Sequence, residues 1–195
     1  MKKLFFNCQF TGLHQKTTLI SMGIVSEDGD VFYAEFTDYD KSQVDDWIQS
    51  NVIDKCLVMK EEGVIQTSRI LHVKSDTDTI KRHLDRWLDK FEKVEMYGDH
   101  VAYGWVLFCN LFGDALNLPK NICYIPVDIC TIFKLKGIDP DGDRLDYIYP
   151  DIMDFSMLFK PLSFLARNRT RHNAFYNAHV TKACYEKLVA GTVTK

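Results

Sequence analysis

The segment "TTLISMGIVSEDGDVFYAEF", residues 17–36, contains two β-rich runs that are joined by the turn "EDGD". Asp-Gly between such runs is a strong indicator of a β-hairpin. The run before it, "KKLFFNCQF" at residues 2–10, is also rich in strand-forming residues. We therefore expect three antiparallel strands at the start of the chain. The first of them carries two amides one residue apart, Asn7 and Gln9, where a strand end often presents two carboxylates to a metal.

Helices and single strands follow this β-rich start. The apolar spacing predicts helices at residues 41–53, 75–91, 101–116 and 171–188, strands at residues 68–73 and 94–99, and a strand that passes into a helix at residues 124–137. Residues 139–155 are expected to form a polar loop. The spacing of its aspartates is that of an EF-hand, but position 12 of such a loop would be Pro150 and not a Glu, so a solvated turn is expected and not a calcium site. The order predicts an α/β fold with one mixed sheet flanked by helices.

The chain has 195 residues, which suits one domain over residues 1–195, with an irregular helical segment around residues 40–75. A net charge of -3 gives no general attraction to nucleic acids or anionic membranes. No apolar run approaches the ~20 residues of a membrane span, so no membrane partner is expected. The short apolar stretch after the first lysines does not suit a signal peptide. These features predict a cytoplasmic protein whose six cysteines are reduced structural thiols.

Four segments together resemble a known enzyme family: "FFNCQFTGL", "LISMGIVSEDGDVFYAEF", "AYGWVLFCNLFG" and "RHNAFYNAHV". They are similar to segments of the DEDD superfamily of 3′–5′ exonucleases, in its histidine-containing branch. More narrowly, they look like the mycobacterial-type 3′–5′ exoribonuclease domain. The likeness covers nearly the whole chain. It implies a ribonuclease H-like fold and, in the family, two Mg²⁺ or Mn²⁺ ions that support hydrolysis of terminal phosphodiesters.

The resemblance also implies where the site residues lie. The family's Asp-x-Glu motif falls on Asn7 and Gln9, and the Asp of its "YDW"-like motif falls on Gly104. Its His-x-x-x-x-Asp motif falls on His172, which is kept as the general base, and on Asn177. Every position that would hold a metal-binding carboxylate is therefore neutral. Because Mg²⁺ and Mn²⁺ prefer anionic oxygen ligands, we expect no tight two-metal site and no bound cofactor.

A neutral site can still bind phosphate, because amide NH₂ groups donate hydrogen bonds and no carboxylates repel the ligand. For three residues after the first strand the resemblance implies contact with a 3′ end: Thr11, Gly12 and Leu13. A basic cluster before the last helix is also suited to an anion: Arg167, Arg169 and Arg171. The leading hypothesis is a catalytically impaired exonuclease-like protein that binds a nucleotide or a single-stranded RNA or DNA 3′ end.

Three alternatives stay open at the level of sequence. The first is an active metal-dependent exoribonuclease that takes its ligands from other acids: Asp99, Asp114 or Asp128. The second is an enzyme inactivated on purpose, although Gly104 is an unusual choice for that. The third is a decoy or inhibitor that binds a protein partner, with residues 146–159 as a candidate surface. Association of two copies of the chain as a homodimer is also compatible with the sequence.

Overall fold

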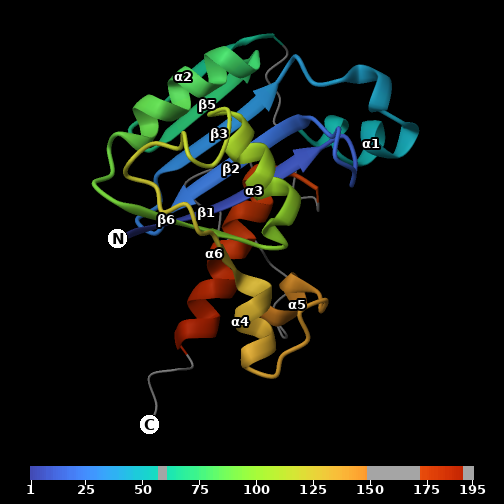
Figure 1. Ribbon diagram of the computed structural model, residues 1–195. Helices are drawn as coiled ribbons and strands as arrows, with labels where there is room; N and C mark the ends of the chain where they lie inside the picture. The colour runs from blue at the N-terminus through green and yellow to red at the C-terminus, as the bar shows by residue number, and fades with distance from the viewer. Residues whose placement is uncertain (57–60, 149–171, 191–195) are drawn as a thin grey trace.

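The computed structural model describes residues 1–56, 61–148 and 172–190 (Figure 1). This part of the chain forms one seven-stranded sheet in the order β4-β5-β3-β2-β1-β6-β7. Its strands are β1 (Lys2–Phe10), β2 (Leu19–Ser26), β3 (Val31–Phe36), β4 (Gly63–Gln66), β5 (Ile70–Ser75), β6 (Val94–Gly98) and β7 (Val127–Asp128). Strands β1, β2 and β3 are antiparallel neighbours, whereas β6 runs parallel to β1 and β5 runs parallel to β3.

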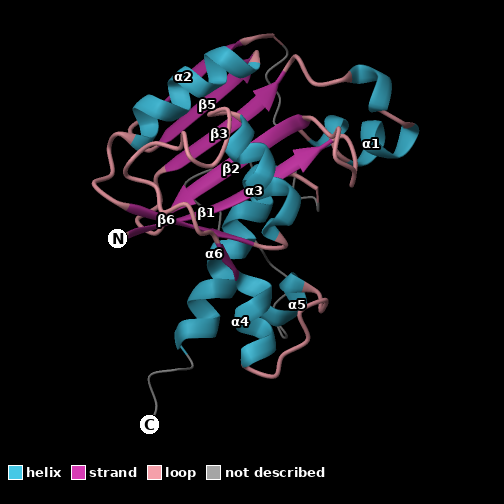
Figure 2. Cartoon of the chain, in the orientation of Figure 1, coloured by secondary structure: helices cyan, strands magenta, loops and turns pink. Residues whose placement is uncertain are grey.

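Helices cover both faces of the sheet (Figures 1 and 2). The helices are α1 (Asp46–Asn51), α2 (Thr77–Leu88), α3 (Val101–Asn110), α4 (Ile129–Leu135), α5 (Arg144–Ile148) and α6 (Ala174–Ala190), with 3-10 turns η1 (Lys41–Gln43) and η2 (Ile53–Lys55). Helices α2 and α3 pack with alternate residues of β1, including Leu4 and Phe6, in the larger apolar cluster. Helices α4 and α6 pack with Val25 and Tyr33 in a second cluster. These layers confirm the predicted mixed α/β fold, which is consistent with a ribonuclease H-like architecture.

Several boundaries differ from those predicted. Residues 41–53 are not one helix, because the Asp45 carboxylate accepts a hydrogen bond from the Ile48 amide at 2.7 Å and starts α1 anew. Helix α3 ends at Asn110 rather than near residue 116, and Gly113 follows in a left-handed turn with φ 97°. The segment around residues 40–75 is helical only in its first half. Its second half is the hairpin of β4 and β5, of which only β5 was predicted.

The polar loop predicted at residues 139–155 contains helix α5, which the sequence interpretation missed. Asp143 explains the helix start, because its carboxylate accepts the Leu145 amide at 2.7 Å. Asp139 closes the turn before it by accepting the Asp141 amide at 3.0 Å. These two aspartates therefore serve local backbone capping. No helix within the described ranges is long and apolar enough to cross a membrane.

Candidate functional site

Three amide side chains meet where β1 passes under α6. The Gln9 Nε2 donates a hydrogen bond to the Asn7 Oδ1 at 2.8 Å, and the Asn177 Nδ2 donates to the same oxygen at 3.4 Å. Phe5, which shares this side of β1, contacts the ring of Tyr185 on α6. Successive strand residues point to opposite faces, so Asn7 and Gln9 follow Phe5 on the α6 side. We call Asn7, Gln9 and Asn177 the amide trio.

A glycine on β2 allows α6 to come this close to the sheet. Gly23 lies directly across the β1–β2 ladder from Asn7. A Cβ at Gly23 would lie 2.4 Å from the carbonyl oxygen of Ala174, the first residue of α6. The missing side chain therefore sets the height of α6 above the sheet, and with it the reach of Asn177 toward Asn7.

His172 lies before α6 and not within it, which corrects the predicted placement. The helix begins at Ala174, and the buried Asn173 caps it by accepting the Tyr176 amide at 3.0 Å. Asn173 also donates to the Lys55 carbonyl at 2.6 Å, which ties the start of α6 to η2. His172 has φ 71°, an uncommon left-handed value for a residue with a side chain. Its ring packs edge-on against Trp47, with 5.0 Å between the ring centroids.

Gly104 is buried in α3 and faces β1. A Cβ at this position would lie 3.6 Å from the Phe6 ring and 3.7 Å from the Cys8 Cβ, which are ordinary contact distances. The backbone of α3 is helical here, so nothing in its conformation requires glycine. A Cβ would therefore fit at this position without moving β1.

A cavity of about 1020 Å³ connects these groups. Its lining includes the two amides of β1, Gly104, His172 and the three residues predicted to contact a 3′ end: Thr11, Gly12 and Leu13. Asn177 lines a smaller adjoining cavity of about 410 Å³, which shares Asn7 and His172 with the first. The structure thus brings the predicted positions together around one hollow region. The arginines at 167, 169 and 171 lie outside the described residues.

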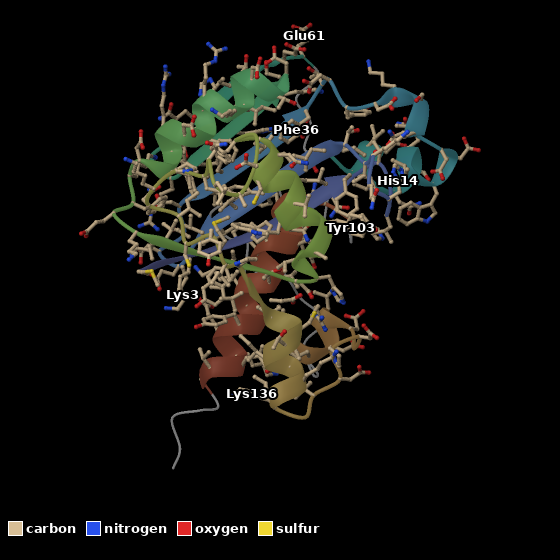
Figure 3. The ribbon with its side chains drawn as sticks, viewed as in Figure 1. Lys3, His14, Phe36, Glu61, Tyr103 and Lys136 are labelled. Carbon is tan, nitrogen blue, oxygen red and sulfur yellow. The ribbon has the colours of Figure 1, made fainter. Side chains whose placement is uncertain are left out.

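The loop after β1 is held by hydroxyl groups. The Thr11 Oγ1 accepts the Thr18 amide at 2.9 Å, and the Thr17 Oγ1 accepts the Gly12 amide at 3.0 Å. Leu13 is 76% exposed, and its carbonyl accepts a hydrogen bond from the Tyr103 hydroxyl at 3.2 Å. Tyr103 is labelled beside His14 in Figure 3, at the end of the sheet where β1 ends. The fixed backbone therefore presents an exposed apolar side chain at the cavity wall.

Sequence reasoning missed the aromatic part of this cavity. Trp47 is one of the apolar residues whose spacing predicted a helix at residues 41–53, but its side chain is 54% exposed and lines the cavity. Tyr103 is 37% exposed and also lines it. Helical spacing alone could not predict that Trp47 lies on the cavity wall. The expected helix breaks at Asp45, and α1 has only one buried residue, Ile48.

Three acidic residues are the candidates for replacement metal ligands. Asp99 and Asp128 line the cavity, but the Asp99 carboxylate is paired with the Arg144 guanidinium at 2.7 and 2.9 Å. Burial raises the pKa of Asp99, but the hydrogen bonds from Arg144 and Cys130 outweigh burial and lower it below its usual value. Asp128 caps α4 by accepting the Cys130 amide at 2.9 Å. Asp114 accepts the Leu116 amide at 2.8 Å and does not line the cavity.

With this geometry in view, comparison with known proteins gives a distant relative. The chain is similar to a 3′–5′ exoribonuclease of Mycobacterium tuberculosis. The sequences from strains CDC 1551 / Oshkosh and ATCC 25618 / H37Rv are each 26% identical to it over 135 residues, which is 69% of this chain and 76% of the relative. No protein-family model matches the chain. This similarity supports an exonuclease-like relationship.

Proposed function

We propose that this chain is an exonuclease-like protein of the DEDD superfamily, in its histidine branch, that binds a nucleotide or a single-stranded RNA or DNA 3′ end and does not cut it. The amide trio carries the proposal. Its residues lie at the positions where the resemblance implies the family's carboxylates, Asn7 and Gln9 line the larger cavity, and Asn177 lines the smaller one beside it. The named activity of the mycobacterial relative supports a nucleic-acid ligand.

The hydrogen bonds within the trio suit neutral amides and do not suit a set of ionised metal ligands. Asn7 accepts from both neighbours at distances of 2.8 and 3.4 Å. Two carboxylates 2.8 Å apart would repel each other by about 6 kcal/mol at an effective dielectric constant of about 20. Amides avoid this repulsion without a metal. They also supply no charge to hold two dications, so His172 has no metal-bound water to deprotonate.

The cavity wall has the groups that a nucleotide needs. Trp47 and Tyr103 present aromatic surface on which a base can stack. The amide NH₂ groups can turn from one another to phosphate or sugar oxygens.

A cytoplasmic location and a protein partner or second copy stay predictions from the sequence. The candidate surface for a protein partner was residues 146–159. Of these, Tyr147 and Ile148 are half-buried against the second apolar cluster, which includes α4 and α6, and residues 149–159 lie outside the described residues.

We expect a 3′-labelled single strand to bind the purified protein equally well in EDTA and in Mg²⁺, with dissociation constants within about twofold. The reason is that amide NH₂ groups donate hydrogen bonds to a phosphate without the help of a metal. Fluorescence anisotropy measures binding, and gel electrophoresis of the same samples measures cleavage. Binding that requires Mg²⁺ or Mn²⁺, or a strand that shortens, would contradict the proposal and favour the active-enzyme alternative.

Replacing Trp47 by Ala is expected to weaken this binding by about 5- to 150-fold, since one base stacked on an aromatic side chain contributes about 1–3 kcal/mol. Trp47 is more than half exposed, so the fold should tolerate the change. Tyr124→Ala is the matched control, because Tyr124 is 65% exposed and does not line the cavity. Equal affinity of the two variants would show that Trp47 does not contact the strand.

A further inference from the structure

A second cluster of side chains, separate from the amide trio, lies at the ends of β6 and β7. Asp99 and His100 follow β6 directly, and Cys130 lies in the first turn of α4, which follows β7. The Asp99 Oδ1 lies 3.0 Å from the Cys130 Sγ and 2.9 Å from the His100 Nδ1, and the last two atoms are 3.6 Å apart. A carboxylate, an imidazole and a thiol therefore converge from two neighbouring parallel strands.

The spacing of these three atoms is close to that of three ligands around one metal ion. Tetrahedral Zn²⁺ with bonds of about 2.3 Å to sulfur, 2.05 Å to nitrogen and 2.0 Å to oxygen separates sulfur from nitrogen by about 3.6 Å, and places oxygen about 3.3–3.5 Å from each. The distance from the Cys130 Sγ to the His100 Nδ1, 3.6 Å, already has this value, but the Sγ lies 3.7 Å from the Nε2 as well, so the exposed imidazole has to turn its Nδ1 toward the metal. The two distances to the Asp99 oxygen, 3.0 and 2.9 Å, are those of hydrogen bonds and need to open by about half an ångström when a metal replaces the protons.

We propose that Asp99, His100 and Cys130 form a binding site for one thiophilic transition-metal ion, with Zn²⁺ as the expected occupant. Thiolate and imidazole ligands favour Zn²⁺ and Co²⁺ over Mg²⁺, so this site differs in chemistry from a carboxylate two-metal site. The proposal does not rest on the function proposed for the amide trio. It requires only these three side chains.

The charges around the cluster favour a cation. Four carboxylates lie at or beside it: Asp99, Asp128, Asp141 and Asp143. Among the residues that the structure describes, the Arg144 guanidinium opposes them. It donates hydrogen bonds to Asp99 Oδ2 at 2.7 Å, to Asp99 Oδ1 at 2.9 Å and to the Cys130 Sγ at 3.3 Å, and to the carbonyls of Pro140 and Gly142. The guanidinium therefore touches two of the three ligand atoms, and a metal has to displace it from them while the two carbonyls retain it.

An exposed carboxylate lies behind the histidine, just beyond hydrogen-bond distance. The Asp141 carboxylate lies 3.7 Å from the His100 Nε2, on the far side of the ring from the Nδ1 that faces the cluster. A carboxylate behind a ligating imidazole fixes its orientation and raises its basicity. Without metal, burial and the bond to Asp99 raise the pKa of the Cys130 thiol to about 12, so metal binding has to release a proton.

Co²⁺ titration of the full chain tests the site. We expect one equivalent to produce a thiolate-to-cobalt charge-transfer band and the intense d–d bands of tetrahedral cobalt. Zn²⁺ should abolish both. Cys130→Ser should remove the charge-transfer band and weaken Zn²⁺ binding by more than about 100-fold, since losing an outer partner of a ligand already costs about 10–100-fold. Cys123→Ser is the control, because Cys123 is half-buried and outside the cluster.

A second measurement uses the unchanged protein, so it does not depend on how Cys130→Ser folds. Alkylation by iodoacetamide, mapped by mass spectrometry, should slow at Cys130 when Zn²⁺ is added and stay unchanged at Cys123. The proposal is overturned if Cys130 is alkylated at the same rate with and without Zn²⁺, or if the cobalt spectrum shows no thiolate band.

Discussion

A variant that carries Asn7→Asp, Gln9→Glu, Gly104→Asp and Asn177→Asp is expected to degrade a 3′-labelled single strand in Mn²⁺ and to leave it intact in EDTA. The parent protein should show no such activity. Asp and Glu have nearly the shapes of Asn and Gln, so the side chains around the trio need not repack. The floor of the cavity would then carry the anionic oxygens that a two-metal site requires.

Gly104 is the position where this design could fail, and its surroundings favour success. A new Cβ meets Phe6 and Cys8 at 3.6–3.8 Å, which are normal contacts. Gly104 lies in the first half of α3, where the helix dipole favours a carboxylate, and glycine costs a helix about 1 kcal/mol relative to alanine. The Cβ of the new acid therefore needs no change in the helix.

The variant should be less stable than the parent in EDTA, because carboxylates as close as the present amides repel by several kcal/mol. Mn²⁺ should restore the melting temperature. Changing His172 to Ala in the fourfold variant is the matched control. It should lower the rate by about 10²–10⁴-fold, the usual contribution of a general base, and leave Mn²⁺ binding in place. A fourfold variant that folds, binds Mn²⁺ and still leaves the strand intact would show that the old exonuclease site has decayed beyond its ligands.

The elements that could be predicted from the sequence are those specified by local chemistry. The Asp-Gly turn predicted the β2–β3 hairpin, and a run of strand-forming residues predicted β1. A helix was predicted at residues 75–91, and α2 spans Thr77–Leu88, where the Asp76 carboxylate accepts the Thr79 amide at 2.7 Å. Each of these depends on residues within a few positions of one another, so one sequence window contains the information.

The features that could not be predicted depend on contacts between distant residues. The Asp99–Arg144 pair joins residues 45 positions apart, and it decides that Asp99 is engaged before any ligand arrives. Strand β4 is an edge strand with Val64 and Ile65 exposed, so it has no buried face to produce an alternating pattern. Trp47 lies on the cavity wall because α1 is short and begins anew at Asp45, which periodicity over a longer window concealed.

Gly23→Ala is expected to destabilise the fold strongly, although it adds only one methyl group. The new Cβ would lie 2.4 Å from the Ala174 oxygen, 2.7 Å from the Ala174 carbon and 2.8 Å from the Phe175 Cα. All three are backbone atoms of the first turn of α6, so no side chain can turn away to relieve the clash. The helix itself has to lift from the sheet, against the buried cap at Asn173.

We expect a loss of about 3 kcal/mol or more in the free energy of unfolding, at the upper end for overpacking a core. That corresponds to a fall of about 6–12 °C in melting temperature for a domain of this size. Gly104→Ala is the matched control and should be neutral or stabilising by up to about 1 kcal/mol. Differential scanning calorimetry of the two variants separates these outcomes, and equal melting temperatures would contradict the close approach at Gly23.

The same substitution tests how the amide trio is assembled. Asn7 lies across the ladder from Gly23, and Asn177 reaches it from the first turn of α6. Lifting α6 should lengthen the 3.4 Å contact between Asn177 and Asn7 and remove one wall of the site. At a temperature where Gly23→Ala is still folded, single-strand binding should therefore fall by more than about tenfold, a change of about 1.4 kcal/mol. Asn177→Ala measures the same loss without moving the helix. If Gly23→Ala bound the strand as tightly as the parent while Asn177→Ala did not, the height of α6 would not control the site.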